Sequence, residues 1–267
     1  MADVEYTGVD AARCMRIVDR LPHEKATAYA SRVLATNILM LYMPPGSVIN
    51  EPDVAARLGV SRTPVHEAVN LLVARNLVSI APKRATYVSL IDMDVHGQGR
   101  YIRGAVEPLL LNELQGNLSS AQRLVLERNM DWQRKLVALT SPDPEEVILA
   151  DDEFHKFMYV AAGKKLVWSS MRQILGQFDR MRYIGLLFGY DRLRTEEHER
   201  MLQILENGGA PISEIAKLVS SHLDGYQRFY DRLRTSYPEY FRTGQVSTQA
   251  SEAGAEAEPE TPAEAGA

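Results

Sequence analysis

The sequence has little cysteine and no long apolar run. Its one cysteine, Cys14, cannot form a disulfide within the chain, which excludes a small fold held together by disulfides. We find neither a secretory signal peptide nor a run of about 18 apolar residues that would cross a membrane. These absences predict a cytoplasmic protein with no membrane partner. The 267 residues, 45% of them hydrophobic, leave room for two packed domains.

Basic residues are missing from the end of the chain. The net charge is -5, and the stretch from Gly244 to Ala267 has glutamates at five positions without any Lys, Arg or aromatic residue, so residues 1–243 are neutral overall. Such a composition cannot bury enough apolar surface to fold. We therefore predict a disordered acidic tail over 241–267. Residues 1–26 have mixed charge and a weak pattern, and are predicted to be a mobile or partly helical N-terminal extension.

The pattern from Pro52 to Leu72 predicts a helix-turn-helix. A short helix over 52–58 is followed by Gly59, which permits a sharp turn, and then by a second helix that Ser61 can cap and Pro64 can tolerate in its first turn. The second helix has one apolar stripe at i, i+3, i+4 and i+7, made of Val65, Ala68, Val69 and Leu72. Its other face is polar, with Arg62, Thr63, His66 and Asn70. A polar outer face suits a helix that reads DNA.

Two short runs after this pair are typical of β-strands. They cover 77–80 and 86–90, and the segment between them carries Lys83 and Arg84. The result is a winged helix-turn-helix with two cations at the tip of the wing. Arg62 can present a fork to guanine, Ser61 and Thr63 can reach phosphates, and the wing cations can neutralise backbone charge. The alternative is that Ser61 to Pro64 caps an ordinary helix in a small α+β domain.

Residues 27–90 resemble the DNA-binding domain of the GntR family of bacterial transcription regulators. The resemblance lies in Pro45-Gly46, in the stretch from Leu58 to Val65, in Glu67-Ala68 and in the wing that begins at Pro82. It implies a DNA-binding domain over 27–91 and a base-reading position at His66. The family usually has arginine where this chain has His66, and glycine where it has Ala85.

From Asp92 to Pro238 the pattern is helical, with almost no strand signal. Candidate helices are expected near 93–115, 119–139, 145–162, 165–188, 191–207 and 211–235, separated by breaks that contain Gly, Pro or Asn. We therefore predict a mainly α fold, in which an α+β winged domain is followed by an all-α bundle of about six helices over 92–240.

Four side chains of the bundle have metal-ligand chemistry and suitable spacing. Asp151 and His155 are four residues apart, so a helix places them on one face. His198 and His222 lie at similar distances on either side of Gly208-Gly209, so two antiparallel helices would bring them nearly level. Three imidazoles and a carboxylate suit zinc, nickel or another first-row metal. The alternative, for any one of them, is a buried histidine that is simply hydrogen-bonded.

Residues 98–235 also resemble the ligand-binding C-terminal domain, called FCD, of the FadR-like branch of the same family. The matching residues are Arg103, Glu107, Asp151, Phe154, His155, Glu197, His198, His222 and Leu223. The resemblance implies that Asp151, His155, His198 and His222 hold a divalent metal beside a small effector, commonly a carboxylate. Arg103 is a candidate for binding that carboxylate, although an Arg103–Glu107 pair on the helix surface explains it nearly as well.

Two other classes of protein compete with a regulator. A metal-dependent hydrolase could use the Asp/His3 site to activate water, with Glu153 or Glu197 as general base. Both glutamates are next to a ligand, and adjacent helical residues point about 100° apart, which argues against this role. A DNA binder with a purely structural metal is the third class.

We predict a non-enzymatic, dimeric regulator, a repressor in preference to an activator, that binds near-palindromic double-stranded operator DNA. The dimer follows because two recognition helices would read half-sites about one helical turn apart.

Overall fold

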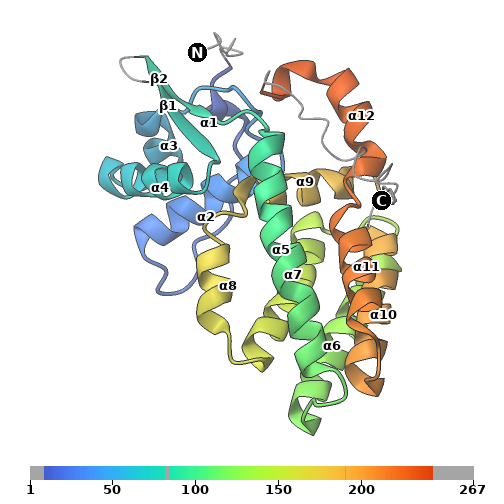
Figure 1. The fold of residues 1–267 in the computed structure, drawn as a ribbon. Helices are drawn as coiled ribbons and strands as arrows, with labels where there is room; N and C mark the ends of the chain where they lie inside the picture. Colours follow the sequence, from blue (N-terminus) through green and yellow to red (C-terminus); the bar gives the residue numbers. More distant parts are fainter. Residues whose placement is uncertain (1–8, 82–83, 190, 243–267) are drawn as a thin grey trace, which may run out of the picture.

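The computed structural model describes residues 9–81, 84–189 and 191–242, so Lys83 and the predicted acidic tail lie outside the described residues apart from residues 241–242 (Figure 1). The chain is mainly helical with a two-stranded wing, which confirms the predicted fold class. In chain order the elements are α1 (Ala11–Cys14), α2 (Ala26–Leu39), α3 (Glu51–Leu58), α4 (Arg62–Ala74), β1 (Val78–Ala81), β2 (Ala85–Val88), α5 (Met93–Leu114), α6 (Ser120–Val137), α7 (Pro144–Ala161), α8 (Lys165–Met171), α9 (Gly176–Leu187), α10 (Asp191–Asn207), α11 (Ile212–Leu223), α12 (Gln227–Ser236) and the 3-10 helix η1 (Pro238–Tyr240).

The helix-turn-helix is formed by α3 and α4 at the upper left of Figure 1, and α4 packs on both α3 and α2. Gly59 ends α3 with a φ of 64°, a left-handed conformation in which a side chain would be strained. The apolar stripe of α4 is fully buried, as predicted. Ser61 does occupy the N-cap position of α4, but its side chain makes no capping hydrogen bond, so the expected cap is wrong. That hydroxyl is exposed beside Arg62.

The wing is an antiparallel pair of strands, β1 and β2. Val78 pairs with Val88 and Ala81 with Ala85. Ala85 is the first residue of β2 and has extended backbone, so the wing does not need the glycine that the family usually has there. Of the two wing cations, Arg84 is described and is exposed.

Residues 9–15 pack against the winged domain. Ala11, Ala12 and Met15 are buried in the same core as α2 and α4. The amide of Ala11 donates a 2.8 Å hydrogen bond to the carbonyl of Val48. The first turn of the described chain is therefore part of the DNA-binding domain.

The helical domain contains more helices than expected, because two predicted helices are each divided. The segment 165–188 forms α8 and α9, and the segment 211–235 forms α11 and α12. At the second break, the carboxylate of Asp224 accepts a 2.7 Å hydrogen bond from Nε of Arg100 on α5, and Gly225 follows. Among the described residues, no helix is both long and apolar enough to cross a bilayer.

Helix α9 joins the two domains. Its first residue, Gly176, lies so close to the carbonyl oxygen of Arg75 at the end of α4 that any side chain would clash. The side-chain amide of Gln177 donates hydrogen bonds to the carbonyls of Asn76 (2.6 Å) and Leu90 (3.2 Å). Arg180 donates to the carbonyl of Ser89 at 2.7 Å. The break before α9 therefore places this helix against the residues that directly follow α4 and β2.

Candidate metal centre and nucleic-acid interface

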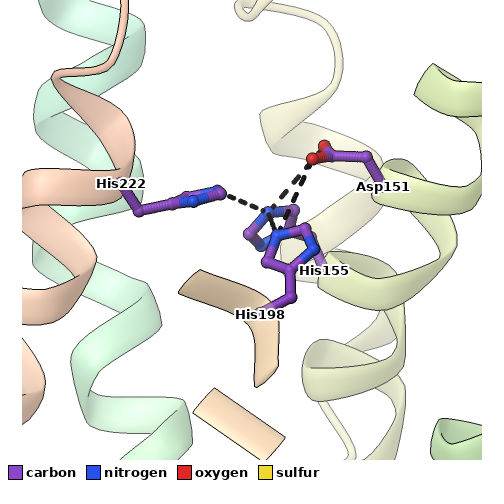
Figure 2. Close-up of side chains that lie close together, drawn as sticks. All are labelled: Asp151, His155, His198 and His222. Atoms are coloured by element: carbon purple, nitrogen blue, oxygen red, sulfur yellow. Dashed lines mark hydrogen bonds and ion pairs between the residues drawn. The ribbon is translucent and has the colours of Figure 1, made fainter. Parts of the chain in front are cut away.

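Four ligand-type side chains converge inside the helical domain (Figure 2). Asp151 and His155 come from α7, His198 from α10 and His222 from α11. One potential ligand atom from each residue lies within 4.8 Å of the other three. The structure thus brings together all four residues that the sequence singles out.

The Nε2 atoms of the three histidines point at one another. The Nε2 atom of His155 lies 3.1 Å from that of His222 and 3.2 Å from that of His198. The Oδ1 atom of Asp151 lies 3.7 Å from Nε2 of His198. The exposed fraction of these four side chains is at most 4%.

Each histidine faces an acceptor with its other ring nitrogen. Nδ1 of His198 lies 2.8 Å from Oε1 of Gln133, and Nδ1 of His222 lies 2.9 Å from Oε2 of Glu197. Nδ1 of His155 lies 3.3 Å from Oε2 of Glu107, at ion-pair distance but without hydrogen-bond geometry. An acceptor at Nδ1 favours the tautomer with the proton on Nδ1, which leaves a free lone pair on Nε2. Partners of this kind orient metal-binding histidines in proteins.

Three converging lone pairs repel one another unless a cation lies among them. Burial lowers the pKa of His155 to about 4, and it lowers the pKa of His198 well below its usual value, with the neighbouring His222 adding to the effect. Both rings are therefore neutral at pH 7. The buried Oδ1 of Asp151 has no hydrogen-bond partner. A divalent metal would satisfy all four atoms, so the residues fit such an ion.

Two arginines fix the carboxylate of Asp151. Its Oδ2 atom accepts a hydrogen bond from Nη2 of Arg182, and its Oδ1 atom lies 3.5 Å from Nη1 of Arg194. Burial alone would raise the pKa of Asp151, but the two guanidiniums outweigh burial and hold this pKa well below its usual range. The carboxylate is thus ionised, and its Oδ1 is the oxygen nearest the histidines.

The Arg103–Glu107 pair is formed, but it is buried and not on the helix surface. Nε of Arg103 lies 2.6 Å from Oε1 of Glu107, and the exposed fractions of the two side chains are 2% and 0%. The i, i+4 spacing predicts a pair without saying which way it faces, and here it faces the cluster. Arg103 therefore lies beside the site, as a candidate for effector binding must. Two of its nitrogens already donate hydrogen bonds to Glu107.

The two glutamates considered as general bases differ. Glu153 is exposed and pairs with Lys156 at 2.7 Å. Glu197 does not point away from the site as helical geometry predicts, because the ligand that it contacts, His222, comes from the neighbouring helix α11. It orients an imidazole.

Three further residues contact the candidate ligands and were not among those predicted from the sequence, namely Gln133, Arg182 and Arg194. Gln133 could have been found, because it follows Leu126 and Met130 on the buried stripe of α6, where an uncharged polar side chain is unusual. The two arginines come from α9 and α10, and their positions in the sequence relative to the ligands do not indicate that they contact the site.

The predicted DNA-reading residues lie on the winged domain. Ser61, Arg62, Thr63 and His66 are exposed along the first turns of α4. His66 faces an acid, because its Nδ1 lies 3.1 Å from Oε2 of Glu51 on α3. Arg84 adds a cation from the wing.

A winged helix-turn-helix joined to an α-helical domain with a buried Asp/His3 cluster is typical of a DNA-binding regulator, and the cluster is consistent with a metal site. Residues 29–88 match the bacterial regulatory proteins of the gntR family, and residues 101–225 match the FCD domain. The chain therefore belongs to the GntR family of transcription regulators, in its FadR-like subfamily with an FCD C-terminal domain. This is a family of regulators and not of enzymes.

Relatives agree with this assignment, and a solved structure shares the fold. An uncharacterized HTH-type transcriptional regulator of Streptomyces ambofaciens is 30% identical over 77% of this chain and 85% of its own length. The HTH-type transcriptional repressor RspR of Escherichia coli is 29% identical over 61% of this chain and 71% of its own. The fold is also similar to that of a GntR regulator from Rhodococcus, with a TM-score of 0.62 and 20% identity over 77% of this chain and 97% of that one.

Proposed function

We propose that this protein is a homodimeric transcription repressor of the cytoplasm, whose affinity for operator DNA is set by a divalent metal and a small organic acid in the helical domain. The observation that carries the proposal is the convergence of three imidazole Nε2 atoms and one carboxylate oxygen in a buried site. This site lies in the same chain as an exposed recognition helix.

The DNA-binding part rests on α4 and the wing. Arg62 is exposed in the first turn of α4, where a guanidinium would form a bidentate pair with guanine in the major groove. Ser61 and Thr63 on either side would contact phosphates, and Arg84 and Lys83 would neutralise backbone charge. Two copies of this domain would read two half-sites of a near-palindromic operator.

The metal-binding part rests on the orientation of each ligand. Asp151, His155, His198 and His222 would hold zinc or nickel, and the ion would supply a positive charge and open coordination positions for an anion. Glu107, Gln133, Glu197 and Arg182 each contact one ligand and leave the ligand atom that faces the centre available.

Helix α9 supports communication between the two sites. Arg182 on α9 contacts the ligand Asp151, and Asp179 on the same helix accepts from Arg182 at 2.9 Å. The other oxygen of Asp179 lies 3.9 Å from Nη2 of Arg75, at the end of the recognition helix. A change at the metal would therefore act on a rigid element that also contacts the DNA-reading domain. A ligand that favours one arrangement of this joint would change DNA affinity.

The test uses a duplex selected by the full-length protein from a random DNA pool. We expect chelation of the metal to change the affinity for this duplex, or its response to small carboxylic acids, in the wild type. His198→Ala should bind the duplex and ignore both treatments, while His23→Ala, which alters an exposed histidine, should behave as wild type. Equal responses of wild type and His198→Ala would remove the metal from regulation.

A further inference from the structure

The chain continues past the FCD match as a segment that we call the C-terminal strap, residues 226–242, which contains α12 and η1 (Figure 1). Helix α12 has one apolar face. Tyr226, Phe229, Tyr230 and Leu233 follow one another at i, i+3, i+4 and i+7, so they share this face. Phe229 and Leu233 are buried. The helix therefore packs on the rest of the molecule through this face.

The start of the strap borders the candidate metal site. Tyr226 and Phe229 line a cavity with about 480 Å³ of empty space, counted out to its open side, and His222 of the cluster lines it too. The ring of Tyr226 meets the ring of His96 on α5 edge-on, with 4.4 Å between the centroids. A molecule in the cavity would therefore contact the start of α12.

The end of the strap holds the linker between the two domains, residues 89–92. The amide of Ile91 donates a 2.8 Å hydrogen bond to the carbonyl of Tyr240, and the carbonyl of Ile91 accepts one of 2.9 Å from the amide of Arg242. The guanidinium of Arg242 also donates to Oδ2 of Asp92 at 2.7 Å. Both backbone groups of Ile91 are therefore bonded to the strap.

A small apolar core joins the strap to both domains. Its buried members come from the linker, from α9 and from the strap, namely Ile91, Met181, Ile184, Phe229, Leu233 and Phe241. Leu41, which follows α2 in the winged domain, packs against them. Met181 and Phe229 also line the cavity. Continuous packing thus connects the cavity wall to the joint between the domains.

The strap begins at a break between two helices. Helix α11 ends at Leu223, and the carboxylate of the next residue, Asp224, accepts a 2.7 Å hydrogen bond from Nε of Arg100 on α5. Asp224 is thus anchored to the helical domain. Because the chain breaks here, α12 can shift without moving α11, which carries His222.

The linker is held from two directions. On one side, Arg180 and Gln177 of α9 donate to the carbonyls of Ser89 and Leu90. On the other, the strap bonds to Ile91. If the strap moved away, only α9 would hold the linker, and the winged domain would adopt more orientations relative to the helical domain.

We propose that the C-terminal strap is a regulatory element, which holds the winged domain in one orientation and is loosened when a molecule in the cavity displaces Tyr226 and Phe229. A rigid helix transmits such a displacement to its other end, where Phe241 and Arg242 would leave the linker. A change in the population of orientations would change DNA affinity. The inference rests on the proposed function for the activity that the strap controls, but the hold on the linker needs no metal.

The first test is amide hydrogen exchange of the full-length protein, measured on its peptides by mass spectrometry. Phe241→Ala removes a side chain from the shared core, so the peptide that contains Ile91 should exchange about tenfold faster or more. Arg242→Ala, which alters an exposed residue, should give a smaller increase. Leu166→Ala, on the exposed side of α8, is the control and should change nothing. Wild-type exchange in peptides of α6 shows that the helical domain is folded.

The second test starts at the cavity wall. Tyr226→Ala should also speed exchange of the peptide that contains Ile91, whereas Tyr226→Phe keeps the ring and should behave as wild type. Tyr101→Ala alters a tyrosine that is 75% exposed on α5, and is the matched control. Faster exchange of α12 in Tyr226→Ala without any change at Ile91 would overturn the coupling.

The third test is the affinity for the selected duplex. Phe241→Ala and Tyr226→Ala should change this affinity in the same direction, by about fivefold or more, and the two controls should not change it. Wild-type affinity in both strap variants, or wild-type exchange at Ile91 in Phe241→Ala and Arg242→Ala, would overturn the inference. If the strap variants behave as expected but chelation of the metal has no effect on the duplex, the metal-dependent function fails and the strap stands.

Discussion

The candidate metal cluster and the proposed DNA-reading face are built in opposite ways. In the cluster each candidate ligand side chain is at most 4% exposed and faces a second residue, as His198 faces Gln133. On the reading face Ser61, Arg62 and Thr63 are exposed on the first turn of a helix. A metal site needs fixed distances before the ion arrives, whereas a DNA-reading side chain can adopt its geometry on the DNA. Substitutions should therefore have larger effects on the partners of metal ligands than on the neighbours of Arg62.

The largest expected effect is the loss of a metal ligand. His222→Ala should weaken zinc binding by more than about 100-fold, beyond the cost of losing a residue that only orients a ligand. The melting temperature of this variant should no longer rise when zinc is added, because zinc raises the melting temperature only of a protein whose folded state binds it. Competition with a chelator measures the zinc affinity, and thermal unfolding measures the melting temperature. Unchanged zinc affinity would show that His222 is not a ligand.

Removing an orienting residue should have the next largest effect. Gln133→Leu fits the apolar stripe of α6 but leaves Nδ1 of His198 without its acceptor, so zinc affinity should fall by about 10–100-fold. Gln173→Leu, which alters an exposed residue, is the matched control. Equal zinc affinities of the two variants would contradict the orienting role.

The buried His96 should make stability depend on pH. Its folded pKa of about 4 is below that of an unfolded histidine, so the unfolded state binds more protons between about pH 6.5 and 4. Stability is therefore complete above pH 6.5 and decreases as pH falls through this window. Between pH 7 and pH 5 the loss from this one group should be about 2 kcal/mol. Urea unfolding of wild type and His96→Phe should reveal this difference, and parallel losses would show that His96 does not contribute.

On the reading face, Arg62→Ala should cost about 1–3 kcal/mol of operator affinity and relax the preference at one base of each half-site. Arg84→Ala should weaken all sequences alike and reduce the salt dependence of binding. Fluorescence anisotropy with the selected duplex and with single-base variants distinguishes these patterns. An equal loss of affinity by Arg62→Ala for selected and random DNA would argue against base reading.

The smallest effect is expected at His66, which stands where the family usually has arginine. His66→Arg adds a permanent positive charge near the phosphates. Glu51, which lies 3.1 Å from the imidazole of His66, would neutralise part of this charge. Affinity for any DNA should rise a few-fold, with a salt dependence steeper by about one charge. An unchanged salt slope would place residue 66 away from the backbone.

The sequence predicts the elements better than their contacts. The Gly59 turn and the buried stripe of α4 could be read from local pattern, and the winged fold and family assignment are confirmed. The meeting of His198 and His222 followed from their distances to Gly208-Gly209, because antiparallel helices leave that turn together. These features depend on short-range geometry.

Features that depend on long-range contacts could not be predicted. At the break before α9, Gly176 packs on the backbone of Arg75, a residue 101 positions earlier. The direction of Glu197 depends on a histidine from another helix, and the burial of Arg103 depends on Phe178 and Glu107 together. No local pattern contains these relations.

The central claim is that this regulator holds a metal with three imidazoles and one carboxylate. X-ray absorption spectroscopy of the purified full-length protein, after incubation with zinc and removal of excess, tests this claim most directly. We predict about one ion per chain, with three imidazole nitrogens at about 2.0–2.1 Å and a carboxylate oxygen at about 2.0–2.2 Å. A bound ion without imidazole ligands, or a protein that retains no zinc, would contradict the account.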